Sequence, residues 1–293
     1  TYLKNLYYLG KQCRGGIKQY TNQMFELILN IKVLFRLPWR AAIGFTEGLL
    51  KKLLPNHIIK VPDFAHASRA ASKLHLKVKQ YNLSPGDMEI AFDSTGISVY
   101  STSGWHQRKY GKNNKYNQKD QWKKVHVGID LNSKQVLVSG FTASNVNDCE
   151  AFNDMSNDLR GNIASVRADA AYDTYKIYKQ IHQWGAKAII PPGNRAKAQD
   201  ELKQKVKIKD YLEQRDKVIH SIRKHNNFEE GLQEWKKESQ YHKRSLIEAF
   251  MYRFKSIFGF SLHNRSERGR RNEIKAKLTL LNLMTSLGMA EYF

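Results

Sequence analysis

The sequence has no long apolar run. Residues 24–35 are the most apolar early segment, but Glu26 and Lys32 interrupt them, whereas a membrane-spanning helix needs about 18 to 20 consecutive apolar residues. The first residues, 1–4, do not have the pattern of a secretory signal peptide. We therefore expect no membrane segment, and we take the chain, which starts without Met, to lack its first residues.

Cysteine is almost absent. The 293 residues include only Cys13 and Cys149, and neither has a second cysteine at CxxC spacing. This argues against a disulfide framework and a structural zinc site, and it fits a reducing cytoplasm. Internal repeats, low-complexity tracts and a glycine-rich phosphate loop are also missing from the sequence, so we expect no ATP site.

Acidic residues are scarce relative to basic ones. Lys and Arg number 49 against 27 Asp and Glu, which gives a formal net charge of +22. Such an excess calls for a polyanionic partner, because like charges repel one another in a compact chain. Nucleic acid is the commonest partner of this kind, and an anionic membrane surface or a ribosome is the alternative.

The first 83 residues have a helical pattern. Apolar residues at helical spacing and Pro or Asp breaks predict helices over 21–35, 41–54 and 64–76. The third of these carries a polar and basic face, formed by Ser68, Arg69, Ser72, Lys73 and Lys77. Three helices with a basic last one favour a helix-turn-helix domain over residues 1–83. A plain helical bundle with a solvated basic face explains the same pattern equally well.

A turn-forming cluster at residues 84–87 opens a region of different pattern, 84–293. Strands are predicted at 88–93 and 96–101 around a tight turn, then at 123–131, 135–142, 164–169 and 186–190. Helices are predicted at 148–159 and 173–184, a polar helical insertion at 194–240, and final helices at 241–259 and 267–289. An antiparallel meander followed by alternating helices and strands indicates an α/β fold with a mixed sheet flanked by helices, an order that the ribonuclease-H-like fold has.

The predicted helix at 241–259 places four chemically active side chains on one face. At 100° per residue, Tyr241, Arg244, Glu248 and Lys255 fall within about 60° of one another. Leu246, Ile247, Phe250, Phe254, Ile257 and Phe258 occupy the opposite side. An acid flanked by bases above a packed face suits phosphate chemistry. An ordinary surface helix with salt-bridged charges has the same appearance.

Two aspartates, Asp93 and Asp169, end predicted strands. A carboxylate at such a place can simply accept hydrogen bonds from the following turn. Asp173 precedes the next helical pattern directly and is the better N-cap, so Asp169 has no evident structural task. Together with Glu248, the two aspartates would suit two Mg²⁺ ions, which prefer oxygen ligands and clamp the oxygens of an in-line phosphoryl displacement.

Two other polar residues have plainer explanations. His126 lies on a predicted strand between lysines, a position typical of a surface or structural histidine rather than a metal ligand. Asp148 starts a predicted helix and is expected to act as its N-cap.

These residues carry a resemblance to a known family. Tyr241, Arg244, Glu248 and Lys255 match Y-x2-R-x3-E-x6-K, a signature similar to that of transposases in bacterial insertion-sequence families four and five. The surrounding residues 241–259 resemble family five more closely. The segments 93–96, 122–130 and 168–174 resemble the family's first acidic motif, second strand block and second acidic motif, although Ala170 stands where a glycine is common.

The resemblance implies a ribonuclease-H-like DDE domain with Asp93, Asp169 and Glu248 as catalytic metal ligands. It also implies that Tyr241, Arg244 and Lys255 position the transposon-end DNA. The expected cofactor is Mg²⁺, as two ions, with Mn²⁺ as a substitute. The expected partners are double-stranded DNA and at least a second copy of the chain in the synaptic complex, in the cytoplasm at the nucleoid.

The implied activity is recognition of terminal inverted repeats, metal-dependent strand cleavage, and attack of the freed 3′-hydroxyl on target DNA. Three rival interpretations remain at the level of the sequence. A nuclease of the same fold would cleave without joining, and a DNA-binding remnant would do neither. An RNA-binding or ribosome-associated protein would not need the three acids.

Overall fold

The computed structural model describes residues 6–7, 19–81, 86–99, 122–202 and 208–288. The chain divides into two compact units. The helical unit comprises residues 1–79 and 254–284, and the sheet unit comprises residues 80–253 and 285–293. The sequence predicted a single division at residue 83. In the structure, residues 254–284 group with the N-terminal helices, and the division falls inside a helix.

The described part of the helical unit contains three short helices and one long helix, besides the end of α9 (Ser245–Phe258). They are α1 (Asn22–Leu34), α2 (Trp39–Leu53), α3 (Phe64–Lys73) and α10 (Glu267–Ser286), with a short strand, β6 (Ser261–Leu262), before the last. Helices α1, α2 and α3 contact one another. The three helices predicted at 21–35, 41–54 and 64–76 are confirmed, with ends that differ by up to three residues.

Side-chain hydrogen bonds set the ends and the packing of these helices. Thr21 caps α1 by accepting from the amide of Met24, and Asp63 caps α3 by accepting from Ala65 and His66. Asn272 of α10 donates to the carbonyls of Ala71 and Leu74, at 2.9 and 2.8 Å. These bonds add partners for carbonyls at the carboxyl end of α3, where the carbonyl of Ala71 also accepts from the amide of Leu74. They fix α3 against α10.

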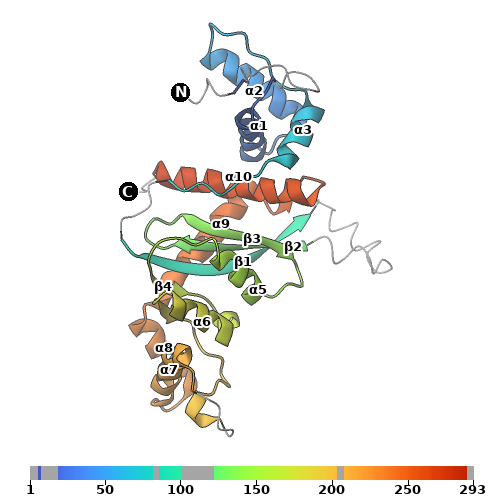
Figure 1. Cartoon of the computed structure of the whole chain (residues 1–293). Helices are drawn as coiled ribbons and strands as arrows, with labels where there is room; N and C mark the ends of the chain where they lie inside the picture. The colour runs from blue at the N-terminus through green and yellow to red at the C-terminus, as the bar shows by residue number, and fades with distance from the viewer. Residues whose placement is uncertain (1–5, 8–18, 82–85, 100–121, 203–207, 289–293) are drawn as a thin grey trace, which may run out of the picture. The chain divides into compact units, whose positions relative to one another are not determined.

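The described part of the sheet unit contains five strands in the order β3-β2-β1-β4-β5. Figure 1 labels β1 to β4. The strands are β1 (Met88–Val99), β2 (Trp122–Asp130), β3 (Val136–Ala143), β4 (Ile163–Arg167) and β5 (Lys187–Ile189). The first three form an antiparallel meander, while β4 and β5 run parallel to β1. This mixed sheet confirms the predicted order of strands and helices and fits a ribonuclease-H-like fold.

One expectation is wrong: the strands predicted at 88–93 and 96–101 are a single strand. Ser94, Thr95 and Gly96 pair in continuous antiparallel register with His126, Val125 and Lys124 of β2. The turn-forming character of Ser-Thr-Gly is overridden because the ladder with β2 satisfies their backbone groups. Asp93 therefore lies in the middle of a strand. The basic loop predicted at 103–120 lies outside the described residues.

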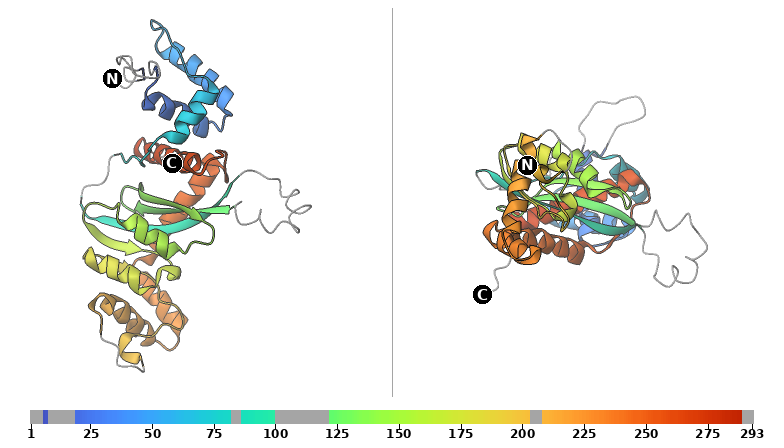
Figure 2. Two further views of the ribbon diagram at one scale, coloured as in Figure 1. Left: turned by 45° about the vertical axis from the view of Figure 1, so that its right-hand side comes forward. Right: turned by 90° about the horizontal axis from the view of Figure 1, so that it is seen from below.

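Alternation along β1 separates a core face from a polar face. Ile90 and Phe92 are fully buried against α5 (Asp148–Ser156) and α6 (Tyr175–Gln183), and the rings of Phe92 and Phe152 lie 4.6 Å apart. Figure 2 shows these two helices on one face of the sheet. Because side chains alternate along a strand, Glu89, Ala91 and Asp93 point to the opposite face.

The predicted insertion at 194–240 is helical. It contains two 3₁₀ turns, η3 (Gln199–Glu201) and η4 (Asp210–Leu212), and the helix pair α7 (Glu213–Arg223) and α8 (Phe228–Glu238). The side chain of Gln214 hydrogen-bonds the backbone of Ala186 and Ala188 at the edge strand β5. Trp235 and Ile222 pack on Ile189. The insertion thus covers an edge that would otherwise expose unpaired backbone groups.

The 3₁₀ turn η5 (Tyr241–Arg244) follows the insertion and leads into α9 (Ser245–Phe258). The predicted amphipathic helix is confirmed from Ser245 onward, while its first four residues are wound more tightly. The predicted inner face is buried at Ile247, Phe250, Phe254 and Phe258. Within the described residues, no helix has the length and apolar character needed to cross a membrane.

Candidate active site

The register between β1 and β4 brings two aspartates together. The last parallel pair joins Ala91 to Arg167. Asp93 lies two residues after Ala91 within β1, and Asp169 lies two residues after Arg167, just beyond the end of β4. A spacing of two preserves the face of a strand, so the two carboxylates lie on the polar face at the same end of the β1–β4 pair.

Asp169 has a structural task that the sequence did not predict. Its carboxylate accepts a hydrogen bond of 2.9 Å from the amide of Ala171 and caps the 3₁₀ turn η2 (Ala170–Tyr172). Asp173, expected to cap the next helix, instead binds Arg215 of α7 at 2.7 and 3.2 Å, and the N-cap of α6 is Thr174. The sequence missed this because Arg215 lies 42 residues away.

Arg244 contacts all three predicted acids. Its Nη1 lies 2.6 Å from Oε1 of Glu248, and its Nη2 lies 3.4 Å from Oδ2 of Asp93 and 4.0 Å from Oδ2 of Asp169. The acids come from β1, from the residues after β4, and from α9. One guanidinium therefore contacts three carboxylates that lie far from one another in the sequence. We call Asp93, Asp169, Glu248 and Arg244 the acidic cluster.

Burial and charge oppose each other in this cluster. Burial raises the pKa of the Asp93 carboxyl, which the amide of Ser94 and Arg244 partly offset, while Asp169 and Glu248 raise it further. Burial disfavours the charge on Arg244, but Tyr241, Asp93 and Glu248 outweigh it and raise the pKa of the guanidinium. Nε of Arg244 is buried and has no hydrogen-bond partner among the described residues.

A second set of charges on the same face was missed by the sequence reasoning. Arg167, which is 3% exposed, donates to Oε2 of Glu89 at 2.7 Å, and Nζ of Lys243 lies 3.7 Å from the same oxygen. Glu89 thus ties η5 and β4 to β1, beside the acidic cluster. The only signal in the sequence is an arginine within an apolar strand two residues before Asp169.

The other two predicted DNA contacts differ in their settings. The ring of Tyr241 lies 5.9 Å from that of Trp235, and Nζ of Lys236 lies 5.6 Å from its centroid. Burial raises the pKa of the Tyr241 hydroxyl, with smaller effects from Arg244 and the three acids. Tyr241 therefore joins the insertion to the cluster. Lys255 belongs to the helical unit, where its ammonium lies 5.8 Å from the ring of Phe260.

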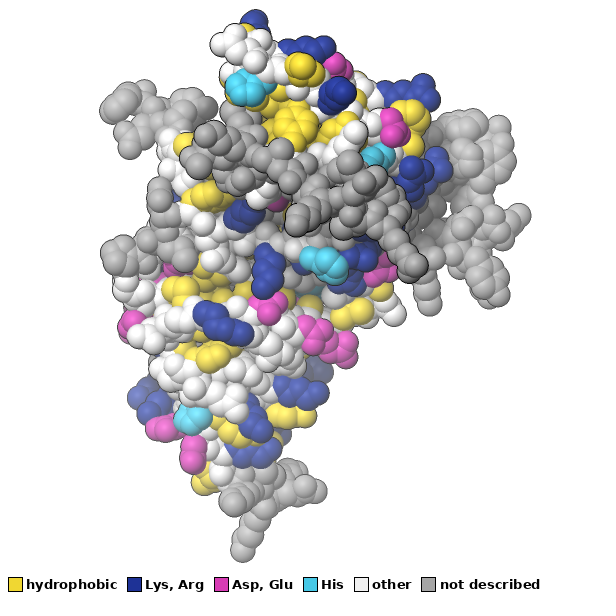
Figure 3. All heavy atoms as spheres, turned by 45° about the horizontal axis from the view of Figure 1, so that its top comes forward, with side chains coloured by type: hydrophobic (Ala, Val, Ile, Leu, Met, Phe, Trp, Pro, Cys, Tyr) yellow, Lys and Arg dark blue, Asp and Glu magenta, His cyan; other side chains and the backbone are white. Residues whose placement is uncertain are grey.

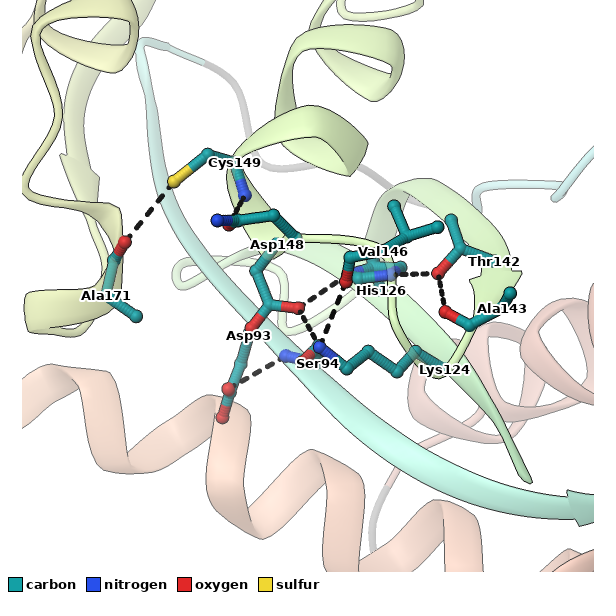
Figure 4. Close-up of polar contacts among 11 residues, drawn as sticks. Asp93, Ser94, Lys124, His126, Thr142, Ala143, Val146, Asp148, Cys149 and Ala171 are labelled. Atoms are coloured by element: carbon teal, nitrogen blue, oxygen red, sulfur yellow. Dashed lines mark hydrogen bonds and ion pairs between the residues drawn. The ribbon is translucent and has the colours of Figure 1, made fainter. Parts of the chain in front are cut away.

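His126 is a buried structural residue. It is fully buried, with Nε2 2.8 Å from Oγ1 of Thr142 and Nδ1 3.6 Å from Asp148 (Figure 4). Burial lowers the pKa of the imidazole. Asp148 also binds Lys124 at 3.0 Å, while Asn147 is the N-cap of α5. The structural role expected for His126 is confirmed, whereas the capping role expected for Asp148 is wrong. Both residues join a network that links β2, β3 and α5.

The donor set fits a hard divalent cation in its chemistry, since carboxylate oxygens are what Mg²⁺ prefers. Among the described residues, no group of three or more His, Cys, Asp or Glu is arranged to hold an ion as it stands. In the acidic cluster a guanidinium lies among the three carboxylates. The site therefore already places a positive charge where three acids converge.

Comparison with protein families gives two matches. One family model of the transposase DDE domain matches residues 84–285, which include the whole acidic cluster. A second model, also described as a transposase DDE domain, matches residues 6–102.

Proposed function

Because the chain belongs to the DDE transposases, enzymes that act on DNA, we propose that it is the transposase of a bacterial insertion sequence, of the kind grouped as family five. It binds the terminal inverted repeats, cleaves a strand at the element end and joins it to target DNA. The observation that carries this proposal is the convergence of Asp93, Asp169 and Glu248 on Arg244.

Family membership implies a divalent metal ion, usually Mg²⁺. We assign its ligands to Asp93, Asp169 and Glu248, as two Mg²⁺ ions with Mn²⁺ as a substitute. Such ions polarise the scissile phosphate and stabilise the attacking and leaving oxygens. The ladder with β2 holds Asp93, the cap on η2 holds Asp169, and the helix α9 holds Glu248. Each carboxylate therefore stands on a fixed element.

The bases around the acids are proposed to hold the DNA backbone. Carboxylates alone repel phosphates, so a site with three of them needs cations to bring a strand close. Arg244 offers a planar guanidinium that binds phosphate oxygens well, and its buried Nε has no partner among the described residues. Tyr241 and Lys255 complete the proposed contacts with the element end.

The proposed reaction has two displacements at phosphorus. Water attacks the phosphate at the element end, the bond from phosphorus to the 3′-oxygen breaks, and a 3′-hydroxyl and a 5′-phosphate result. The 3′-hydroxyl then attacks a phosphate of the target, losing its proton as the target's own 3′-oxygen leaves and takes one up. The first step hydrolyses one phosphodiester bond, and the second exchanges one phosphodiester bond for another, so neither step consumes ATP.

The helical unit is proposed to recognise DNA. A hollow of about 790 Å³ is lined by one side of α3 and by residues 263–266 and 268. Its lining includes Arg69, Lys73 and the aromatic rings of Trp39 and Phe64. Figure 3 shows basic side chains interleaved with hydrophobic ones over the α1–α3 bundle, in the upper part of the view. Basic groups hold phosphates and rings stack on bases.

A second copy of the chain is the proposed protein partner, because synapsis holds two element ends at once. We place the assembly in the cytoplasm, on the chromosomal DNA. Both statements rest on the proposed transposition activity.

The proposal is tested by Mg²⁺-dependent cleavage of duplexes that carry the inverted repeats flanking its own gene. The wild-type chain is expected to cut them and to join the 3′ end to a target duplex. Glu248→Ala is expected to abolish cleavage while leaving end binding intact. Glu229→Gln, which removes one exposed acid from α8, is the matched control and is expected to cut normally.

The rival functions give other outcomes in the same assay. Cleavage without joined product would identify a nuclease of the same fold. Binding without cleavage in any divalent ion would identify a DNA-binding remnant. Cleavage by Glu248→Ala would show that the glutamate assignment is wrong.

DNA recognition by the helical unit is tested separately through salt dependence. The logarithm of affinity falls with the logarithm of salt concentration by about 0.9 per phosphate contact. Arg69→Gln is expected to reduce the magnitude of this slope by about 0.9, which is the value for one phosphate contact. An unchanged slope and affinity would remove α3 from the proposed DNA surface.

A further inference from the structure

The helical unit contains a second cavity, which shares Trp39 and His263 with the hollow proposed to recognise DNA. Its volume is about 390 Å³, within the range of ligand pockets. The polar residues of its lining are Lys32, Arg36, His263, Glu273 and Lys277. Four of these five side chains are basic, and Lys32, Glu273 and Lys277 are buried.

Lys32 is the most informative of these residues. It lies in the last turn of α1, is 6% exposed and lines the cavity. Its ammonium lies 5.4 Å from the ring centroid of Trp39. Among the described residues, it has no hydrogen bond and no carboxylate within 4.0 Å. A largely buried lysine without an ion pair is costly, and an anion that entered the cavity beside its ammonium would offset that cost.

The amino end of α2 opens onto the same cavity. Pro38 and Trp39, the N-cap and first residue of this helix of 15 residues, line it. No side chain caps α2. The first amides of a helix have no partner within the helix and carry a partial positive charge, so an uncapped end binds anions. The ammonium of Lys32 and the end of α2 are independent features with the same preference.

The remaining charges determine how much positive potential is left. Glu273 and Lys277 pair with each other at 3.2 Å. Arg36 donates to the carbonyls of Ser256 and Ile257 at the end of α9, which uses its hydrogen bonds without cancelling its charge. Lys32 and Arg36 therefore give the cavity an excess of two positive charges.

We propose that this cavity binds a single phosphate group, held by the Lys32 ammonium and the first amides of α2. The phosphate belongs to a DNA strand or is free inorganic phosphate, since both present the same oxygens. Burial lowers the pKa of the Lys32 ammonium, although Glu273 raises it, and a bound anion would relieve that cost. This site is separate from the acidic cluster and does not depend on the proposed transposition.

The direct test uses inorganic phosphate with the full chain. Calorimetric titration with phosphate, in a background of chloride at equal ionic strength, is expected to show one site. Lys32→Met keeps the length of the side chain and removes its charge, and it is expected to weaken phosphate binding about tenfold or more. Lys32→Arg is expected to retain it.

The matched control is Lys51→Met, which removes one charge from an exposed lysine on α2 that pairs with Glu47. It is expected to bind phosphate as the wild type does. Equal binding by wild type and Lys32→Met would overturn the proposal, as would the absence of any phosphate binding to the wild-type chain.

The source of the phosphate is distinguished with a DNA duplex. If a DNA strand supplies the phosphate, Lys32→Met is expected to reduce the magnitude of the salt slope of duplex binding by about 0.9, the value for one phosphate contact. If the slope is unchanged while inorganic phosphate binding is lost, free phosphate is the ligand. Both outcomes support the site.

A second measurement guards against a Lys32→Met chain that does not fold. Bound phosphate is expected to draw the Lys32 ammonium away from the ring of Trp39, and this movement is expected to change the tryptophan emission of the wild-type chain. Trp39→Phe is expected to lose that change. A wild-type emission that phosphate does not alter would count against the site.

Discussion

Nη1 of Arg244 lies 2.6 Å from Oε1 of Glu248, four residues further along the chain. The contact spans the change from the 3₁₀ turn η5 to the helix α9. Arg244 also lies within 4.0 Å of Asp93 and Asp169. The charge that keeps three carboxylates from repelling one another is thus supplied by the chain itself, next to the glutamate that it neutralises.

Removal of this charge is expected to strengthen divalent-ion binding. Without the guanidinium, the three acids lose their neutralising partner, and a bound cation gains the attraction that Arg244 now uses. Arg244→Gln is expected to bind Mn²⁺ about tenfold more tightly in calorimetry, although its affinity for DNA falls. Lys217→Gln, an exposed change of equal charge on α7, is the control. Equal or weaker Mn²⁺ binding by Arg244→Gln would show that the guanidinium does not oppose the ion.

The stability of the α7–α8 pair in the insertion is expected to depend on Gly231. A Cβ added to Gly231 of α8 would lie 2.1 Å from the carbonyl oxygen of Ile222 in α7. Gly231→Ala would push the two helices apart, because backbone cannot yield as a flexible side chain does, and is expected to cost about 2 kcal/mol or more. The midpoint of urea unfolding measures this loss.

Gly44→Ala is the matched change in α2, where a Cβ would meet nothing within 4 Å. Here alanine is expected to stabilise the chain by about 0.5 to 1 kcal/mol, since glycine loses more backbone freedom on folding. A similar loss of stability in both variants would contradict the account of close packing between α7 and α8.

The buried pair of Glu273 and Lys277 gives a third prediction. Glu273 is 1% exposed and accepts hydrogen bonds from Asn264 at 3.0 and 2.7 Å, besides Lys277. Glu273→Ala leaves the 2% exposed Lys277 without a carboxylate partner, with only its hydrogen bond to the carbonyl of Ser261, and is expected to cost about 3 to 5 kcal/mol in urea unfolding.

Two variants separate this effect from a general effect of charge. Glu47→Ala breaks an exposed pair on α2 and is expected to cost less than about 1 kcal/mol. Glu273→Leu combined with Lys277→Met is expected to recover most of the lost stability, because no unpaired charge remains buried. A double variant as unstable as Glu273→Ala would mean that the hydrogen bonds to Asn264, rather than the charge, dominate.

The burial of Lys32 is expected to appear in the pH dependence of stability. Burial lowers the pKa of its ammonium in the folded chain, against the opposing effect of Glu273. Between that lowered value and the ordinary value of about 10.4, the unfolded chain binds more protons, so this group makes stability rise with pH. Lys32→Met has no ammonium to bury, so its stability does not include the cost of burying that charge at any pH. In phosphate-free buffer, its advantage over the wild type in urea midpoint is expected to shrink as the pH is raised toward about 10.

A constant difference across that range would contradict the burial of a charged Lys32. Lys51→Met again serves as the control for loss of one positive charge. The comparison between variants is needed because the net charge of +22 also falls as other groups lose protons, and that change affects every variant alike.

The sequence was most informative where the relevant interactions are local. Helical spacing alone put Arg244 and Glu248 on one face, and their contact confirms it. The Ser-Thr-Gly segment after Asp93 was wrongly predicted to form a turn, because turn propensity depends on neighbouring residues whereas the ladder with β2 depends on a distant segment. The pairing of Asp173 with Arg215 joins residues 42 positions apart. No spacing rule reaches such a partner.

Lys32 illustrates a signal that was visible and misinterpreted. It interrupts an apolar run, and in sequence this interruption served only to exclude a membrane segment. Yet Lys32 falls at helical spacing with Phe25, Ile28 and Leu29, all of which are buried. A lysine on the apolar stripe of an amphipathic helix is either buried or marks the edge of the stripe. Only the fold distinguishes the two.

The register that unites Asp93 and Asp169 has a consequence for how this chain can vary. Both residues follow the Ala91–Arg167 pair by two positions, and successive residues of a strand point to opposite faces. Deletion or insertion of one residue between 163 and 169 would turn Asp169 to the wrong side even if the sheet survived. Length changes in this segment should therefore be absent from active copies of the gene, while substitutions that keep its spacing remain open to drift.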